Sequence, residues 1–222
     1  MDLLPTRKSV EEYIRQLERA GAAGAANLPV FEDAGQSYAA RIASSDWVPF
    51  VHQADYHYFV ARILFLQHIL EYSLFASHQC IENYLKGFLR LRDQPPTGHH
   101  RLSHLVGEAR RVSLTADSFV RSNYLDTIAS KFDPFYEMPR YPVQRTKPKD
   151  GYAVFYPADV FVLDYFVLRM REILHLPKPG WDILTDQGSF FLQQCQMNAK
   201  EIYDLFFLWN ISFSPAGPAG TA

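Results

Sequence analysis

Cysteine is scarce in this 222-residue chain. The two cysteines, Cys80 and Cys195, are far apart in the sequence and form no CxxC pair. Isolated cysteines that sit within helical patterns are usually buried and belong to proteins of a reducing compartment. We therefore expect a cytoplasmic protein in which both thiols pack as small hydrophobic side chains.

The chain also lacks a long uninterrupted hydrophobic run. Its most apolar stretch, YFVARILFLQHILEYSLFA, is broken by four polar residues, namely Arg62, Gln67, His68 and Glu71. This composition predicts a buried helix rather than a membrane span. The first twenty residues are charged and amphipathic, which is not the pattern of a signal peptide. We therefore expect no membrane association.

An excess of charge of one sign is missing as well, because the net charge is only −2. Any attraction to a polyanion must therefore be local. Two segments are locally basic: residues 84–111 hold six Lys and Arg against two acidic residues, and residues 140–150 hold four against one. If they converge, they form a surface suited to a nucleotide or an RNA backbone. A solvated basic face is the alternative interpretation.

Hydrophobic residues make up 48% of the chain and aromatic residues 15%, which is enough for one sizeable core. Apolar residues recur every three or four positions through most of the sequence, and almost no segment has the alternation of a strand. The pattern predicts helices over residues 9–20, 47–74, 77–91, 99–112, 115–132, 158–176 and 189–211. The break between the second and third is expected near Ser77, and Asp117 or Thr115 is expected to cap the helix at 115–132. Residues 132–157 carry five prolines and predict a long ordered loop.

The predicted fold class is all-α: an antiparallel up-and-down helical bundle of four to five core helices with N-terminal and C-terminal helical extensions. We divide the chain into an N-terminal extension (1–46), the bundle (47–176), a C-terminal helix packed on the bundle (177–213) and a disordered tail (214–222).

Residues 77–90, SHQCIENYLKGFLR, carry two regular stripes. The apolar stripe consists of Ile81, Tyr84, Leu85, Phe88 and Leu89, and it predicts a core-facing side. The polar stripe consists of Gln79, Glu82, Asn83, Lys86 and Arg90. Glu82 and Lys86 can form an ordinary i,i+4 surface ion pair. Alternatively, the polar stripe faces inward and must then be satisfied by its own members or by a ligand.

Three segments in order resemble the HEPN domain family (higher eukaryotes and prokaryotes nucleotide-binding). They are SHQCIENYLKGFLR, then HHRLSHLV after a proline-containing turn, then FYEMPRYP. The resemblance covers roughly residues 52–176. It maps the family's Gln, Glu and Leu-Lys onto Gln79, Glu82 and Leu85-Lys86, its His onto His100, and its Arg-Tyr-Pro onto Arg140-Tyr141-Pro142. His99 and Arg101 depart from the family pattern, which predicts an altered cap on the helix that follows.

The resemblance implies an antiparallel helical bundle, a homodimer, and a small nucleotidyltransferase-like partner in a toxin–antitoxin-like or stress-response system. It implies that nucleotide or RNA phosphate is bound by Lys86, His100, Arg140 and Tyr141, with Gln79 and Glu82 orienting them. In chemical terms, a lysine offers phosphate a point charge and an arginine offers a planar fork.

Two other chemistries can be compared with the residues present. A metal-independent ribonuclease of the same fold would need an arginine and a histidine at short spacing, and Arg92 with His99 is the nearest pair. Arg140, with no histidine four to seven residues after it, and His100 are further candidates for such an enzyme. His100 and His104 have i,i+4 spacing but no accompanying ligand motif, so we expect no metal and no cofactor.

We therefore expect a nucleotide- or RNA-phosphate-binding protein rather than an enzyme. A ribonuclease toxin is the first alternative, and a non-catalytic interaction or dimerisation module is the second.

Overall fold

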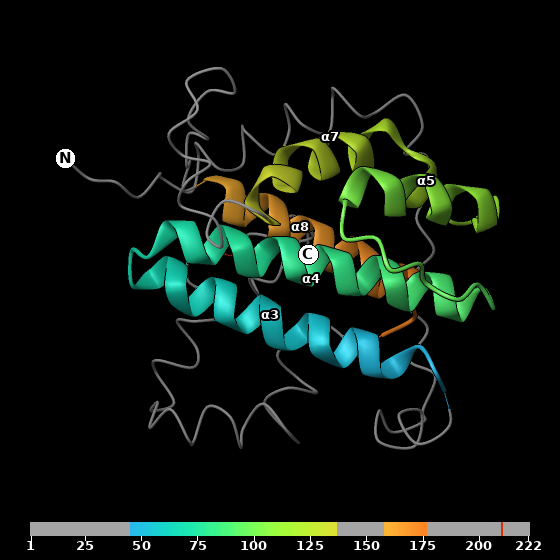
Figure 1. The fold of residues 1–222 in the computed structure, drawn as a ribbon, viewed down its shortest axis with the longest axis horizontal. Helices are drawn as coiled ribbons and strands as arrows, with labels where there is room; N and C mark the ends of the chain where they lie inside the picture. Colours follow the sequence, from blue (N-terminus) through green and yellow to red (C-terminus); the bar gives the residue numbers. More distant parts are fainter. Residues whose placement is uncertain (1–44, 137–157, 177–209, 211–222) are drawn as a thin grey trace, which may run out of the picture.

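A computed structural model describes residues 45–136, 158–176 and 210, and every regular element within them is helical (Figure 1). The all-α prediction is therefore confirmed. The elements are α3 (Val48–Leu66), α4 (Leu70–Leu91), α5 (Leu102–Val112), α6 (Ser118–Arg121), α7 (Asn123–Phe132), the 3₁₀ helix η1 (Asp133–Tyr136) and α8 (Ala158–Ile173). None of these helices is long and apolar enough to cross a membrane. The predicted helix at 9–20, the predicted helix at 189–211 apart from Asn210, and the tail lie outside the described residues, so the domain division stays a prediction.

The long helix expected over residues 47–74 is wrong, because the chain turns at 67–69 rather than near Ser77. His68 takes a left-handed conformation with φ of 60°. The backbone N–H of Ile69 then donates to the carbonyl of Leu64 at 2.8 Å, which closes the end of α3. Ser77 does not break α4, since its hydroxyl donates to the carbonyl of Ser73 at 2.8 Å inside the helix. No glycine or proline marks the real turn, so no local sequence pattern indicates its position.

α3 and α4 form an antiparallel hairpin with unusually close contact near its open end (Figure 1). A Cβ added to Gly87 would lie 3.0 Å from the Cγ2 atom of Val51 and 3.4 Å from the carbonyl oxygen of Trp47. Near the turn, the hydroxyl of Ser73 donates to the carbonyl of Ala61 at 2.7 Å. Small side chains at both ends therefore bring the two helices together along their length.

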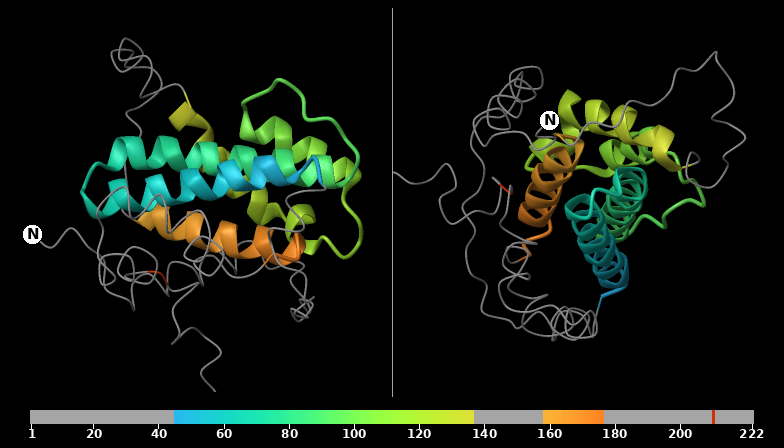
Figure 2. Two further views of the ribbon diagram at one scale, coloured as in Figure 1. Left: turned by 90° about the horizontal axis from the view of Figure 1, so that it is seen from below. Right: turned by 90° about the vertical axis from the view of Figure 1, so that its left-hand side faces the viewer.

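α5, α6 and α7 pack over one side of this hairpin, and α8 lies along another (Figure 2). The single helix expected over 115–132 is divided, because Ser122 is extended between α6 and α7. Asp117 precedes α6, but its carboxylate accepts hydrogen bonds from Arg92 and from the N–H of Leu114 instead of capping that helix. The expected cap at this position is therefore wrong.

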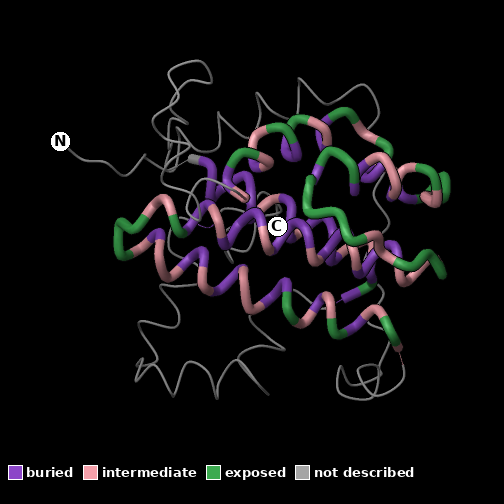
Figure 3. The backbone as a smooth tube through the Cα atoms, in the orientation of Figure 1, coloured by how far each residue is buried: buried purple, intermediate pink, exposed green. Residues whose placement is uncertain are grey.

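The faces that the helices turn toward one another are buried (Figure 3). One continuous core joins α3, α4, α5, α7 and α8, and fully buried Phe88, Phe132 and Phe166 belong to it. Phe119 and Tyr124 contact Tyr165 of α8 with ring centroids 6.2 and 5.1 Å apart. These aromatic contacts connect α6 and α7 to α8.

Two buried ion pairs hold α8 against α3. Arg171 donates to both carboxylate oxygens of Asp55 at 2.8 and 2.7 Å, and Arg62 donates to Asp164 at 2.7 Å. In each helix the aspartate precedes the arginine by seven residues. The two identical spacings match only when the helices run antiparallel, because a parallel arrangement would place like charges together. The pairs therefore define both the direction and the register of α8 on α3.

Neighbouring hydroxyl and amide groups complete this network. Tyr84 of α4 donates to Asp55, and Tyr58 donates to Asp164 at 2.7 Å. Asn210 in turn donates to the Tyr58 oxygen at 2.9 Å. Burial raises the pKa of both tyrosines well above the ordinary value, and the adjacent carboxylates raise it further, so both phenols remain neutral donors.

Reversing Asp164 alone to arginine should lower the free energy of unfolding by about 3–5 kcal/mol, because Arg62 would then face a buried like charge. The double variant Arg62→Asp with Asp164→Arg restores opposite charges and should recover part of that loss. Urea unfolding measures both values. Arg111→Asp, at an exposed position, should change stability by only about 0.5 kcal/mol. This account is contradicted if the double variant loses as much free energy of unfolding as the Arg62→Asp and Asp164→Arg single variants lose together.

Candidate functional site

Glu82 of α4 is almost fully buried, with 3% of its surface exposed, although it belongs to the polar stripe. One of its carboxylate oxygens, Oε1, accepts from Lys86 Nζ at 2.7 Å and from His100 Nδ1 at 2.9 Å. The other, Oε2, accepts from Gln79 Nε2 at 3.3 Å. Gln79, Glu82 and Lys86 lie on one side of α4 because they are three and four residues apart. Three members of the polar stripe therefore meet at one buried carboxylate, and the lysine pairs with it there.

His100 is held in place by the residue that caps α5. The N–H groups of Leu102 and Ser103 donate to the carboxylate of Asp133 at 2.5 and 3.3 Å. Asp133 belongs to η1 and lies about thirty residues further along the chain, so the cap is supplied by a distant element. The negative charge of Asp133 also interacts favourably with the positive end of the helix dipole at the N-terminus of α5. The segment before α5, which carries His100, is thereby attached to η1.

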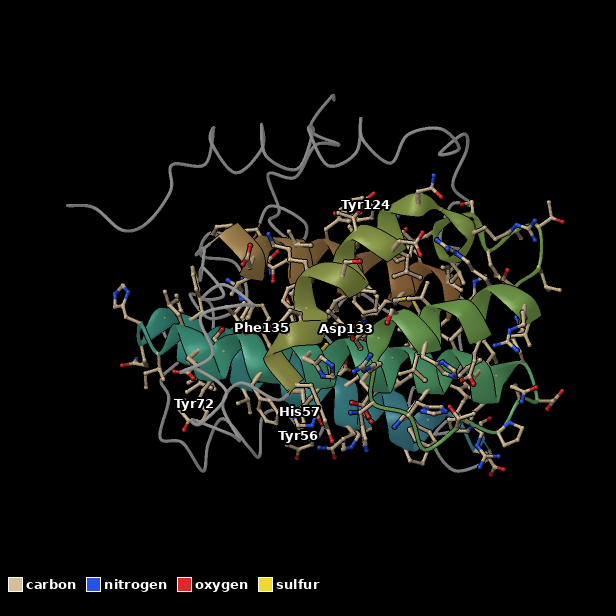
Figure 4. The ribbon with its side chains drawn as sticks, turned by 45° about the horizontal axis from the view of Figure 1, so that its top comes forward. Tyr56, His57, Tyr72, Tyr124, Asp133 and Phe135 are labelled. Atoms are coloured by element: carbon tan, nitrogen blue, oxygen red, sulfur yellow. The ribbon has the colours of Figure 1, made fainter. Side chains whose placement is uncertain are left out.

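Tyr136 at the end of η1 stacks on the His100 ring, with centroids 4.9 Å apart and planes inclined by 11°. Its ring also lies 5.3 Å from that of His78, which precedes Gln79 on α4. Figure 4 shows Asp133 and Phe135 of η1 on the same side of α4 as His57 of α3. The Glu82 cluster is defined here as Gln79, Glu82, Lys86, His100 and Tyr136.

Two further histidines border the cluster and are kept neutral by burial. Desolvation lowers the pKa of the fully buried His78 to about 4, although the charge of Glu82 opposes the shift. Burial also lowers the pKa of His57, again against the influence of Glu82, and His57 lies 3.2 Å from the amide of Gln53. Near neutral pH, both imidazoles are therefore uncharged, and Lys86 balances the charge of Glu82.

The structure brings together four of the six residues predicted to bind phosphate: Gln79, Glu82, Lys86 and His100. Arg140 and Tyr141 lie outside the described residues. Sequence reasoning missed His57, His78 and Asp133, and it included Tyr136 only as part of the FYEMPRYP segment, without linking it to His100. The position of His78 beside Gln79 was a possible signal, whereas nothing local connects Asp133 or Tyr136 with α4.

Arg92 and His99, the nearest pair for a ribonuclease, make contacts outside the Glu82 cluster. Arg92 donates to both oxygens of Asp117 at 2.8 Å and lies over the ring of Phe88. The rings of His99 and His104 are 4.1 Å apart, and His104 also lies 3.4 Å from Glu108. His100 and His104 therefore contact different carboxylates. Within 45–136 and 158–176, no group of three or more His, Cys, Asp or Glu side chains is arranged to hold a metal ion.

The family comparison agrees with this architecture. The family model described as HEPN domain matches residues 49–161, which is half of the chain. The chain therefore belongs to the HEPN domain family, whose members are generally related to nucleotides and RNA. Comparisons with curated proteins and with solved structures gave no match.

Glu82→Gln should lower the free energy of unfolding by about 1–3 kcal/mol, because Lys86 and His100 lose their shared charged acceptor. A double-mutant cycle with His100→Gln should give a coupling of about 0.5–3 kcal/mol. Glu108→Gln is the matched control, since its carboxylate contacts His104 and Thr97 outside the cluster and should matter less. Additive effects of Glu82→Gln and His100→Gln would contradict a shared hydrogen bond.

The buried His78 predicts acid sensitivity. Its folded-state pKa of about 4 lies below the ordinary 6.5, so the unfolded chain binds its proton first as the pH falls. Stability should decrease by up to about 3 kcal/mol from this group between pH 6.5 and about pH 4. The free energy of unfolding of His78→Gln, measured in urea, should depend less on pH over that window. Equal slopes for the wild type and the variant would refute the assignment.

Proposed function

We propose that this protein binds nucleotides or RNA through their phosphates at the Glu82 cluster, with Lys86 and His100 contacting the phosphate. The observation that carries the proposal is the shared acceptor: a single oxygen of Glu82 receives hydrogen bonds from both side chains. A buried carboxylate thereby holds an ammonium group and an imidazole side by side. This arrangement positions two phosphate-binding groups in advance, which lowers the entropy lost on binding.

Lys86 keeps donor capacity for a ligand, and His100 has a second ring nitrogen, Nε2, that Glu82 does not occupy. An ammonium group has three N–H donors, and Glu82 accepts from Lys86 only once. The Lys86 side chain is 12% exposed and that of His100 is 49% exposed, so their outer atoms face accessible space. Gln79 and Glu82 lie behind them and orient them. A phosphate on the accessible side would meet lysine and histidine rather than the carboxylate.

Charge around the cluster supports an anionic ligand. Of the six basic residues between 84 and 111, Arg92 and Arg110 are neutralised by Asp117 and Asp126. Arg90 and Arg101 have no ion pair with a described carboxylate, and they follow Lys86 by one helical turn and His100 by one residue respectively. Arg111 is exposed and lies outside the cluster, so two of the three arginines without such an ion pair adjoin cluster residues along the chain.

The aromatic ring of Tyr136 adds a stacking surface for a base to the proposed site. It lies parallel to His100, and bases stack on such rings without sequence preference. Arg140 and Tyr141 follow it by four and five residues, a chain length of at most about 18 Å. We include both in the proposed site, as the arginine fork and a further ring.

The proposed biological setting follows from the family. We propose a cytoplasmic homodimer that acts with a minimal nucleotidyltransferase in a toxin–antitoxin-like or stress-response system. No contact among the described residues bears on the partner, and the proposal rests on family membership. The two alternatives, a ribonuclease and a pure interaction module, become outcomes of the binding experiment.

Thermal unfolding with a panel of nucleotides and a short RNA should reveal stabilisation of the folded state by at least one of them. A ligand at 100 times its Kd contributes about 2.7 kcal/mol. Lys86→Met should weaken its binding about tenfold or more, equivalent to about 1.4 kcal/mol. Arg111→Met, which removes an exposed cation outside the cluster, should bind nearly as the wild type does.

Three results would count against the proposal. Absence of stabilisation by every ligand would favour the interaction module. Equal weakening by Lys86→Met and Arg111→Met would indicate nonspecific attraction. Cleavage of the RNA, lost in His99→Ala or His100→Ala, would favour the ribonuclease.

A further inference from the structure

We propose that binding of a phosphate group at the Glu82 cluster is coupled to uptake of one proton, which His100 carries on Nε2. This inference rests on the proposed function and adds to it a dependence on pH. It follows from the hydrogen bond between Glu82 and His100, from the exposure of His100, and from the groups that surround both. It makes the ligand's affinity a function of proton concentration close to neutrality.

Glu82 decides which nitrogen of the neutral His100 ring carries the hydrogen. Its Nδ1 atom lies 2.9 Å from Glu82 Oε1, and the same oxygen accepts from Lys86 at 2.7 Å. A carboxylate in an ion pair with lysine offers only lone pairs, so the hydrogen between Nδ1 and Oε1 belongs to the imidazole. Glu82 therefore selects the tautomer of the neutral ring, in which Nδ1 carries the hydrogen.

The other ring nitrogen, Nε2, decides whether His100 can bind a phosphate group. In the neutral tautomer that Glu82 selects, Nε2 has a lone pair and no hydrogen. Phosphate oxygens also have only lone pairs, so this form of His100 repels the ligand. The imidazolium form donates from both nitrogens and adds a positive charge. A phosphate at this position is thus bound by protonated His100, and the proton is taken from solvent as the ligand binds.

Among the described titratable groups around the cluster, only His100 is placed to take up the proton. His78 on α4 and His57 on α3 are both neutral at physiological pH because burial opposes their charged forms. On η1, Asp133 accepts from the N–H groups that begin α5, and Tyr136 is the stacking partner. In the segment of His100 itself, Arg101 is permanently charged. His100 is half-exposed and its Nδ1 contacts Glu82, which leaves Nε2 as the ring nitrogen that can meet a ligand and take the proton.

The energetic consequence is a linkage between ligand and proton. Where His100 is mostly neutral in the free protein, each unit of pH increase should lower the affinity by at most about tenfold. Where it is already protonated, affinity should be independent of pH. Lys86 keeps its charge throughout, so it contributes binding that does not vary over this range. The site would bind its ligand more tightly in mildly acidic than in mildly alkaline conditions.

Calorimetric titration tests the coupling directly. The probe is a short RNA oligonucleotide without terminal phosphates, because phosphodiesters keep their charge near neutrality whereas terminal phosphates titrate at about pH 6. Titrations in two buffers of different ionisation enthalpy, at about pH 8, give the number of protons taken up. We expect close to one proton per bound site in the wild type and a smaller number at about pH 6.

Two variants assign the proton. His100→Gln places a non-titrating amide at the same position, and it should bind more weakly with no proton uptake and no pH dependence. His104→Gln is the matched control, because His104 is an exposed histidine that contacts Glu108 outside the cluster. It should retain the uptake and affinity of the wild type. Circular dichroism of each variant confirms that the helical fold is intact.

The results separate this inference from the function on which it rests. RNA binding without proton uptake, or with uptake that persists in His100→Gln, would overturn the coupling and leave the proposed binding site standing. Uptake lost in His57→Gln but kept in His100→Gln would overturn the assignment to His100. Absence of binding at both pH values would overturn the proposed function and the coupling together.

Discussion

The pairing of Asp55 with Arg171 and of Arg62 with Asp164 is the constraint on which the arrangement of the bundle depends. Four ionised side chains without access to water are tolerable only when each is matched by an opposite charge and by hydrogen bonds. The helices α3 and α8 satisfy that condition in one direction and one register. Hydrophobic packing alone would allow several positions of α8, since apolar contacts are not directional. The ion pairs reduce these possibilities to one.

α4 connects this buried network with the candidate site. Tyr84 on one side of the helix donates to Asp55, while Glu82 and Lys86 lie on another side and contact His100. Residues two apart on a helix point in clearly different directions, so one short stretch serves both purposes. This explains why the polar stripe is as regular as the apolar one. The apolar stripe packs in the core, and Gln79 and Lys86 of the polar stripe donate to the carboxylate of Glu82, which His100 before α5 also contacts.

Glu82 has a role that differs from that of a surface ion-pair partner. A solvated Glu–Lys pair at this spacing contributes only a few tenths of a kcal/mol to a helix. Here the carboxylate is buried and accepts from three side chains, two of them on α4 and one on a distant segment. It therefore determines the orientation of His100 and the tautomer of its ring. The chemistry available at the surface of the cluster is set by a residue that is itself hidden from solvent.

The sequence by itself determined the helical class, the family, and the residues of α4 that form the polar stripe, because helical periodicity and short motifs are local properties. It also indicated Lys86 and His100 as partners at one site. Only the tertiary structure decided that Glu82 of the polar stripe is buried, that Asp133 caps α5, and that Tyr136 stacks on His100. It also moved the turn between α3 and α4 to His68 and separated Arg92 from the cluster through Asp117. These features depend on contacts between residues far apart along the chain, and no local pattern encodes which distant carboxylate or ring will be brought into reach.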